Sequence, residues 1–157
     1  MNFSIDGMTE AQTSLDRLYT ALRGCEIQEE EVENEFSFQY KKMMDDDFNV
    51  PGALAVFFEI AKSINSFKDS DQFDQANQLA TILVSLAKPL GVLQQDPEDY
   101  LKSGVQLSED KIEGLIRERE VARKNKDFKK SDQIRDELIS MNIVLEDSAD
   151  GTSWRRK

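Results

Sequence analysis

The stretch "DDDFNVPGALAVFFEIAKSIN" (residues 45–65) contains a sharp break followed by a strongly apolar helical pattern. Asn49 is a favourable N-cap, and Pro51 lies in the first turn, where a helix tolerates proline. Apolar residues then cover most of the girth of a helix predicted at 51–67; they are Leu54, Val56, Phe57, Phe58, Ile60, Ala61 and Ile64. A helix that is apolar on most sides is buried by its neighbours, so this stretch predicts the central helix of a bundle.

Three more helices are predicted around this central one. The first starts at Thr9, in a capping box with Gln12, and ends at Gly24. The second carries an apolar stripe at Val32–Met43, and the fourth covers residues 71–90. Short polar segments join these helices, which is typical of an antiparallel helical bundle.

The pattern changes after the bundle. Residues 94–107 lack helical periodicity and contain Pro97 and Gly104. We therefore expect a linker at 96–107, between one domain at 1–95 and a second at 108–157.

The second domain is predicted to begin with a helical pair. Ser108 is a suitable N-cap for the first of these helices, and the second runs to about Met141. Asn142 can adopt the left-handed conformation that closes a helix. The β-branched run that follows and the Asp-Gly pair at 150–151 predict a C-terminal β-hairpin. The expected fold class is thus mostly α, an antiparallel helical bundle followed by a small α+β domain of two helices plus a C-terminal β-hairpin.

Composition excludes several classes of function. The 157 residues include no histidine and a single cysteine, Cys25, so His-based catalysis, His-containing metal sites and CxxC motifs are excluded. The sequence shows no secretory signal and no run of about 18 apolar residues. We therefore expect a cytoplasmic protein without a membrane segment.

The charge is unevenly distributed along the chain. The formal net charge is −11, of which residues 1–100 contribute −12 and residues 101–157 contribute +1. Only the second part can approach a phosphate backbone without a general electrostatic penalty.

A basic run lies in that second part, in "ARKNKDFKKSDQIRDEL" (residues 122–138). An aromatic residue, Phe128, lies among its cations, which are Arg123, Lys124, Lys126, Lys129 and Lys130. The lysines could contact phosphates while the ring stacks on an unpaired base. The alternative is a solvated polar helix pair with Phe128 packed in the core.

Three residues near the run are further candidates, and each also has an ordinary structural role. Asp132 shares a helix face with Phe128 and can accept hydrogen bonds from a base edge or form an ion pair with Arg135 or Lys129. Asp147 ends the first strand, where capping a turn is its ordinary role. Trp154 can pack against a helix or stack on a ligand. The terminal cations, including Arg155, either touch phosphates or form a charged end.

No catalytic or metal site is predicted. The three aspartates at 45–47 are consecutive, point in different directions and lack the alternating ligands of a calcium loop. No phosphate-binding glycine loop and no catalytic triad pattern is present.

Several segments nevertheless resemble one family. They are "SLDRLYTALRG" (14–24), "MMDDDFNVPGALAVFFEIAKSIN" (43–65), "LAKPLGVLQQDPEDYLKSG" (86–104) and the whole of 112–157. In this order they resemble the C-terminal part of bacterial cysteinyl-tRNA synthetases. The resemblance implies a DALR-type helical bundle followed by an anticodon-binding domain. It also implies that the catalytic domain, which uses ATP and zinc, lies outside this chain, so that the chain alone is inactive and holds no cofactor.

The resemblance also implies roles for particular residues. Arg123, Asp132 and Asp147 match positions that contact anticodon bases, and Phe128 matches a stacking position that usually holds tryptophan. The sequence departs from the family pattern at Val50, where threonine is common, and at Asn142, where glycine is common.

We therefore expect the tRNA-recognition part of a cysteine–tRNA ligase. Its expected partners are the anticodon stem-loop of cysteine tRNA, with the anticodon GCA, and the catalytic domain of the same enzyme, in a monomeric protein. The alternative is a stand-alone acidic helical module that binds another protein.

Overall fold

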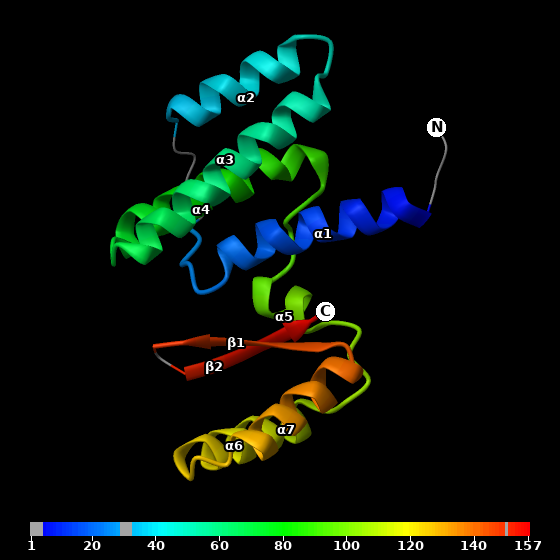
Figure 1. Ribbon diagram of the computed structural model, residues 1–157. Coiled ribbons are helices and arrows are strands. Elements are labelled where there is room, and N and C mark those ends of the chain that lie inside the picture. The colour runs from blue at the N-terminus through cyan, green and yellow to red at the C-terminus, as the bar shows by residue number, and fades with distance from the viewer. Residues whose placement is uncertain (1–4, 29–32, 150) are drawn as a thin grey trace. The chain divides into compact units, whose positions relative to one another are not determined.

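The computed structural model describes residues 5–28, 33–149 and 151–157 (Figure 1). The chain divides into two compact units, Met1–Glu98 and Asp99–Lys157. Within the described residues, every helix is too short or too polar to cross a lipid bilayer.

The first unit is a helical bundle built around α3. It contains α1 (Ile5–Leu22), α2 (Glu35–Asp45), α3 (Val50–Asp69), α4 (Phe73–Ala87) and the short 3₁₀ helix η1 (Lys88–Leu90). Helix α3 packs against α1, α2 and α4, which confirms the predicted central helix (Figure 1). Its buried residues are Ala53, Val56, Phe57, Ile60, Ala61 and Ile64. Leu54, in contrast, is 37% exposed, because it lies on the solvent side of the helix.

The start of α3 follows the predicted cap. Asn49 Oδ1 accepts a 2.9 Å hydrogen bond from the backbone N–H of Gly52. Asp47 and Phe48 precede it with left-handed φ angles of 53° and 52°. A Cβ atom at Gly52 would lie only 2.8 Å from Met43 Sδ, so glycine is what lets α2 and α3 approach at this corner.

Helix α1 differs from the prediction at its start. It begins at Ile5, so the predicted start at Thr9 is wrong, and Thr9 lies inside the helix, where its carbonyl accepts from Thr13 Oγ1 at 2.9 Å. The Gln12 side chain donates to Asp16 one turn ahead, at 3.0 Å. A capping-box pattern does not stop a helix that can continue upstream. Val32, part of the stripe predicted for the second helix, lies outside the described residues.

The second unit contains the helices α6 (Glu109–Lys124) and α7 (Phe128–Ser140) and the strands β1 (Ile143–Ser148) and β2 (Gly151–Arg156). The short helix α5 (Pro97–Lys102) precedes them, within the region expected to be a linker, and the boundary between the two units falls inside it. Fold class is confirmed as mostly α with an antiparallel hairpin at the C-terminal end.

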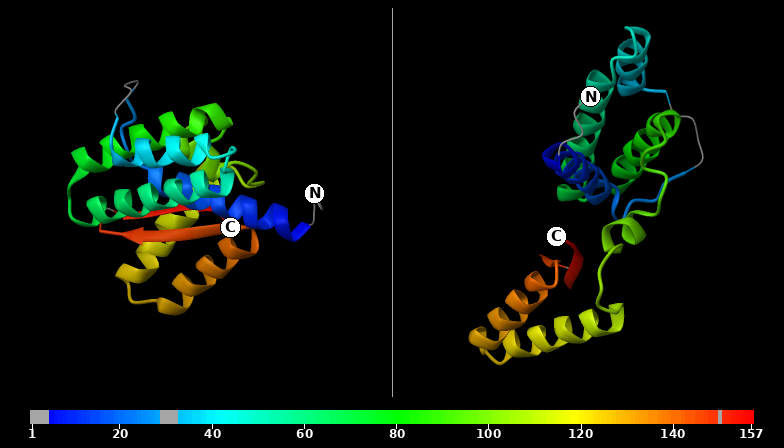
Figure 2. Two further views of the ribbon diagram at one scale, coloured as in Figure 1. Left: turned by 90° about the horizontal axis from the view of Figure 1, so that it is seen from above. Right: turned by 90° about the vertical axis from the view of Figure 1, so that its right-hand side faces the viewer.

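The hairpin packs on the helical pair α6–α7 (Figure 2). The shared core consists of Ile112, Ile116, Ile134, Leu138, Ile143 and Trp154. Asn142 joins α7 to β1 with a left-handed φ of 62°, as predicted. In the hairpin register, Asp147 lies opposite Thr152 and Leu145 lies opposite Trp154.

Candidate nucleic-acid interface

The basic run forms the corner between α6 and α7. Helix α6 ends at Lys124, Lys126 turns the chain with a φ of 58°, and Asp127 caps α7 by accepting a 3.1 Å hydrogen bond from Lys130 N. This geometry places Phe128 at the first position of α7. The corner is therefore held by its own backbone and cap, and its cationic side chains are exposed.

An ion pair between α6 and β1 lies next to this corner. Arg119 donates from Nη1 to Asp147 Oδ1 at 3.0 Å and from Nη2 to Asp147 Oδ2 at 2.9 Å. The Arg119 side chain is only 6% exposed, whereas that of Asp147 is 44% exposed. Two parallel bonds fix both the position and the plane of the carboxylate.

Two further donors reach the same carboxylate. Thr152 Oγ1 donates to Asp147 Oδ1 at 2.7 Å, as the hairpin register allows, and Arg123 Nη1 donates to Oδ2 at 3.3 Å. The structure thus brings together Arg123 and Asp147, two of the residues that sequence reasoning selected. It adds Arg119 and Thr152, which that reasoning missed.

These contacts change the acidity of both partners. The hydrogen bonds from Arg119, and after them the bond from Thr152, hold the pKa of Asp147 well below its ordinary value of 3.8. Hydrogen bonding to Asp147 raises the pKa of Arg119, and the nearby charges of Asp132 and Glu120 act in the same direction. Asp147 is therefore a carboxylate, and Arg119 a cation, at any pH near neutral.

Asp132 lies one helical turn after Phe128 on α7 and is exposed. Among the residues that the structure describes, none forms a hydrogen bond or ion pair with its carboxylate, so the alternative ion pair with Arg135 or Lys129 is not formed. The acceptor atoms of Asp132 are consequently available to a ligand.

Phe128 is 63% exposed. The alternative in which its ring packs in the core is therefore wrong, and Phe128, the first residue of α7, is not among the residues of the hairpin core. An exposed ring surrounded by cations is suited to stack on an unpaired base.

The candidate phosphate contacts differ in how freely they can reach a ligand. Lys130 Nζ already forms an ion pair with Glu118 at 2.7 Å, and Arg155 Nε forms one with Glu146 at 2.7 Å. Lys124, Lys126 and Lys129 are exposed, and in the described part of the chain they form no ion pair. These three lysines are therefore the available cations of the corner.

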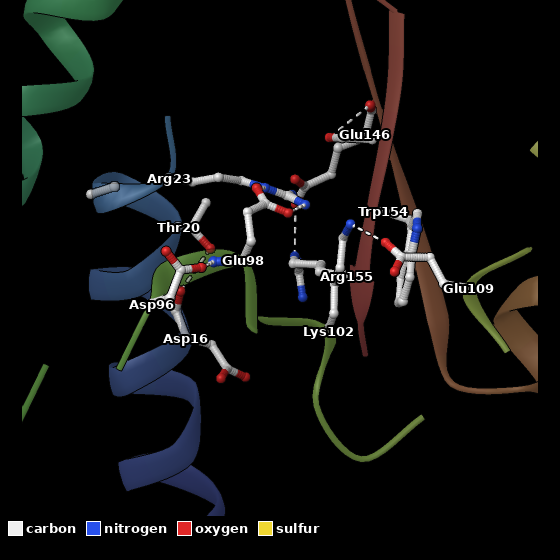
Figure 3. A network of polar contacts seen from close by, with 12 residues as sticks. Asp16, Thr20, Arg23, Asp96, Glu98, Lys102, Glu109, Glu146, Trp154 and Arg155 are labelled. Atoms are coloured by element: carbon white, nitrogen blue, oxygen red, sulfur yellow. Dashed lines mark hydrogen bonds and ion pairs between the residues drawn. The ribbon is translucent and has the colours of Figure 1, made fainter. Parts of the chain in front are cut away.

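Trp154 lies in the core and not on the surface. It is 3% exposed, and its Nε1 donates to Glu113 Oε1 at 3.2 Å. Lys102 Nζ lies 5.1 Å from the centroid of the indole ring and forms a 2.6 Å ion pair with Glu109 (Figure 3). The ring accordingly holds β2 against α6 and has no face open to a base.

One sequence signal could have identified Arg119. It lies at i+7 from Ile112 and i+3 from Ile116, and therefore on the buried stripe of α6. A charged residue on such a stripe needs an ionic partner, and Asp147 provides it.

The described residues give no candidate metal centre. Within residues 5–28, 33–149 and 151–157, no group of three or more His, Cys, Asp or Glu could hold an ion.

Two segments of the chain match known protein families. Residues 39–94 match the family described as DALR domain, and residues 108–155 match the family described as Cysteinyl-tRNA ligase anticodon binding domain. The second match contains the whole α6–α7 corner and the Arg119–Asp147 pair.

Relatives that are similar in sequence share one name, cysteine–tRNA ligase. A cysteine–tRNA ligase of Mannheimia succiniciproducens is 48% identical over 99% of this chain and 34% of its own length. Those of Serratia proteamaculans and Pseudoalteromonas translucida are 45% and 47% identical, over 35% and 34% of their lengths. The chain thus spans about a third of the length of the curated relatives it matches. Two segments of this chain are thus similar to the DALR domain family and to the cysteinyl-tRNA ligase anticodon-binding family, respectively.

Proposed function

We propose that this chain binds the anticodon stem-loop of cysteine tRNA through the α6–α7 corner and the adjacent end of the hairpin. The observation that carries the proposal is the exposed ring of Phe128, which lies among exposed lysines within the anticodon-binding family match. The lysines attract the backbone, the ring stacks on an unpaired base, and polar side chains read base edges.

Base reading is assigned to Arg123, Asp132 and Asp147. The carboxylate of Asp132 has no partner among the described residues and can accept N–H groups from a base such as guanine. The guanidinium of Arg123 is half exposed and retains N–H donors beyond the one given to Asp147. Carboxylates suit base edges and not phosphates, which explains their presence beside a basic run.

The larger activity that we propose is ATP-dependent attachment of cysteine to its tRNA by a cytoplasmic, monomeric ligase of which this chain is the tRNA-recognition part. The relatives are named cysteine–tRNA ligase and are about three times as long, so the catalytic domain would be a further partner. Contacts at the anticodon would add binding energy that commits the acceptor end to a distant active site. The acidic bundle would brace the tRNA with few phosphate contacts.

A binding experiment tests this proposal. The chain is titrated with an RNA stem-loop that carries the GCA anticodon and with one that carries a different anticodon, at two salt concentrations. We expect tighter binding to the GCA loop, and Asp132→Ala should weaken that binding by about 1–3 kcal/mol while changing binding to the other loop far less.

Asp136→Ala is the matched control, because Asp136 is an exposed aspartate one turn further along the same helix. Equal losses on both loops after Asp132→Ala would contradict base reading. Absence of binding even at low salt, together with capture of a protein partner, would favour the acidic interaction module instead.

A further inference from the structure

The position of Arg119 is unusual for a basic residue in an RNA-binding unit. Its side chain is buried, so it cannot reach a phosphate, and its Nε is buried without a hydrogen-bond partner among the described residues. A buried guanidinium with an unsatisfied donor is expensive for stability. Such a departure from good packing is expected where a residue serves a site.

What Arg119 contacts is the carboxylate of Asp147, whose acceptor positions are all in use. A carboxylate offers about four lone-pair positions. Here Arg119 takes two of them, Thr152 takes one on Oδ1 and Arg123 takes one on Oδ2. Asp147 therefore cannot accept an N–H from a base until one of these donors leaves.

The four hydrogen bonds differ in how easily they can open. The bond from Arg123 is the longest, at 3.3 Å, and the Arg123 side chain is 51% exposed. The bonds from Arg119 and Thr152 are 2.7–3.0 Å long and come from buried or half-buried side chains. Arg123 is therefore the donor that can leave, while the other two hold the carboxylate where it is.

We propose that Arg119 is a positioning residue of the anticodon site, which keeps the Asp147 carboxylate in place and compensates its charge while Arg123 moves from Asp147 to the RNA. One lone pair of Oδ2 then becomes free to accept an N–H from a base. The inference rests on the proposed function and adds a residue and an exchange step to it.

Charge supports this arrangement. Without Arg119, departure of Arg123 would leave the Asp147 carboxylate without a cationic partner next to the phosphates of the RNA. With Arg119 in place, the Asp147 charge stays compensated by two direct hydrogen bonds. A carboxylate held in this way can read a base without repelling the backbone.

The test measures discrimination, defined as the ratio of the Kd for the stem-loop with another anticodon to the Kd for the GCA stem-loop. Arg119→Lys keeps the positive charge but loses the bidentate hydrogen bonding to Asp147. We expect discrimination to fall by about 10-fold, as for loss of one base contact. Arg117→Lys, at an exposed arginine on the same helix, should leave discrimination unchanged.

A merely structural role is separated from a positioning role by repeating Arg119→Lys in the Asp147→Asn background, with folding checked by circular dichroism. If Arg119 acts through Asp147, it should change discrimination little in that background. Undiminished discrimination in Arg119→Lys, or the same loss in both backgrounds, would overturn the inference while the proposed function stands. Failure of the unmodified chain to discriminate would overturn both.

Thr152→Val provides a second route if Arg119→Lys does not fold. This change removes the Thr152 donor from Asp147 Oδ1 and retains a β-branched residue on β2. Discrimination should fall by about 3-fold, less than for Arg119 because one bond is lost instead of two. Unchanged discrimination in a folded Thr152→Val chain would contradict positioning of Asp147.

Discussion

The indole Nε1 of Trp154 on β2 donates a 3.2 Å hydrogen bond to Oε1 of Glu113 on α6. Because the ring is also part of the core, Trp154→Ala should lower the free energy of unfolding by about 3–5 kcal/mol, and Trp154→Phe by a smaller amount, about 1–2 kcal/mol. Urea unfolding followed by circular dichroism measures both. Unchanged stability with a loss of RNA binding would contradict the packing role.

The exposed ring of Phe128 should matter to RNA and not to stability. Phe128→Ala should change the free energy of unfolding by less than about 0.5 kcal/mol, but weaken binding to the GCA stem-loop by about 1–3 kcal/mol through lost stacking. Phe128→Trp should retain or strengthen binding because its ring is larger. Phe38→Ala is the control, since Phe38 is 64% exposed on the acidic bundle. Equal losses from both alanine variants would argue against stacking at Phe128.

Lys129 and Lys130 are neighbours that should differ in their contribution to RNA binding. Lys130 is paired with Glu118, whereas Lys129 forms no ion pair with the described residues. Lys129→Gln removes one charge that can contact a phosphate. It should therefore reduce the slope of log Kd against log salt concentration by about 1, and Lys130→Gln should reduce this slope less. Titrations at several salt concentrations measure the two slopes. A larger effect at Lys130 would show that its pair with Glu118 opens on binding.

Stability in acid should depend on Asp147. Its pKa in the folded chain lies well below 3.8, chiefly because Arg119 and then Thr152 donate hydrogen bonds to the carboxylate. The unfolded chain therefore binds a proton at higher pH than the folded chain does. The stabilisation from Asp147 is complete above the unfolded pKa and is lost as pH falls toward the folded one.

The fluorescence of Trp154, the only tryptophan, reports unfolding of the second unit in this comparison. The difference in free energy of unfolding between the unmodified chain and Asp147→Asn should be constant near neutral pH and shrink below about pH 4. If this difference already shrinks near pH 6, or if Asp136→Asn gives an equal difference in the free energy of unfolding, the ion pair between Arg119 and Asp147 would be contradicted.

Local sequence patterns are sufficient to predict much of this fold. The N-cap at Asn49, the apolar girth of α3 and the left-handed Asn142 all depend on residues close in sequence, and the structure confirms each of them. The predicted start of α1 is wrong, because a favourable capping sequence at Thr9 does not prevent the helix from extending upstream to Ile5. Such boundaries depend on the balance of weak local preferences.

The candidate site is less predictable because its geometry depends on contacts between elements. Whether Phe128 is buried depends on which elements pack beside the start of α7, and whether Asp147 has partners depends on packing of the hairpin against α6. Charged residues are mostly exposed, which argues against a buried Arg119. The composition of the corner, in contrast, indicates a basic surface directly.

The second unit also has a simple order of contacts along the chain. Helix α6 packs on α7, α7 packs on β1, and β1 pairs with β2, so each element contacts its neighbour in sequence. Such local topology favours rapid folding. The Arg119–Asp147 and Glu113–Trp154 bonds join residues 28 and 41 positions apart and should form after the helical and strand hairpins. Substitutions at Arg119 or Asp147 would then mainly accelerate unfolding and leave the folding rate nearly unchanged, so the proposed site can vary in evolution without slowing the formation of its scaffold.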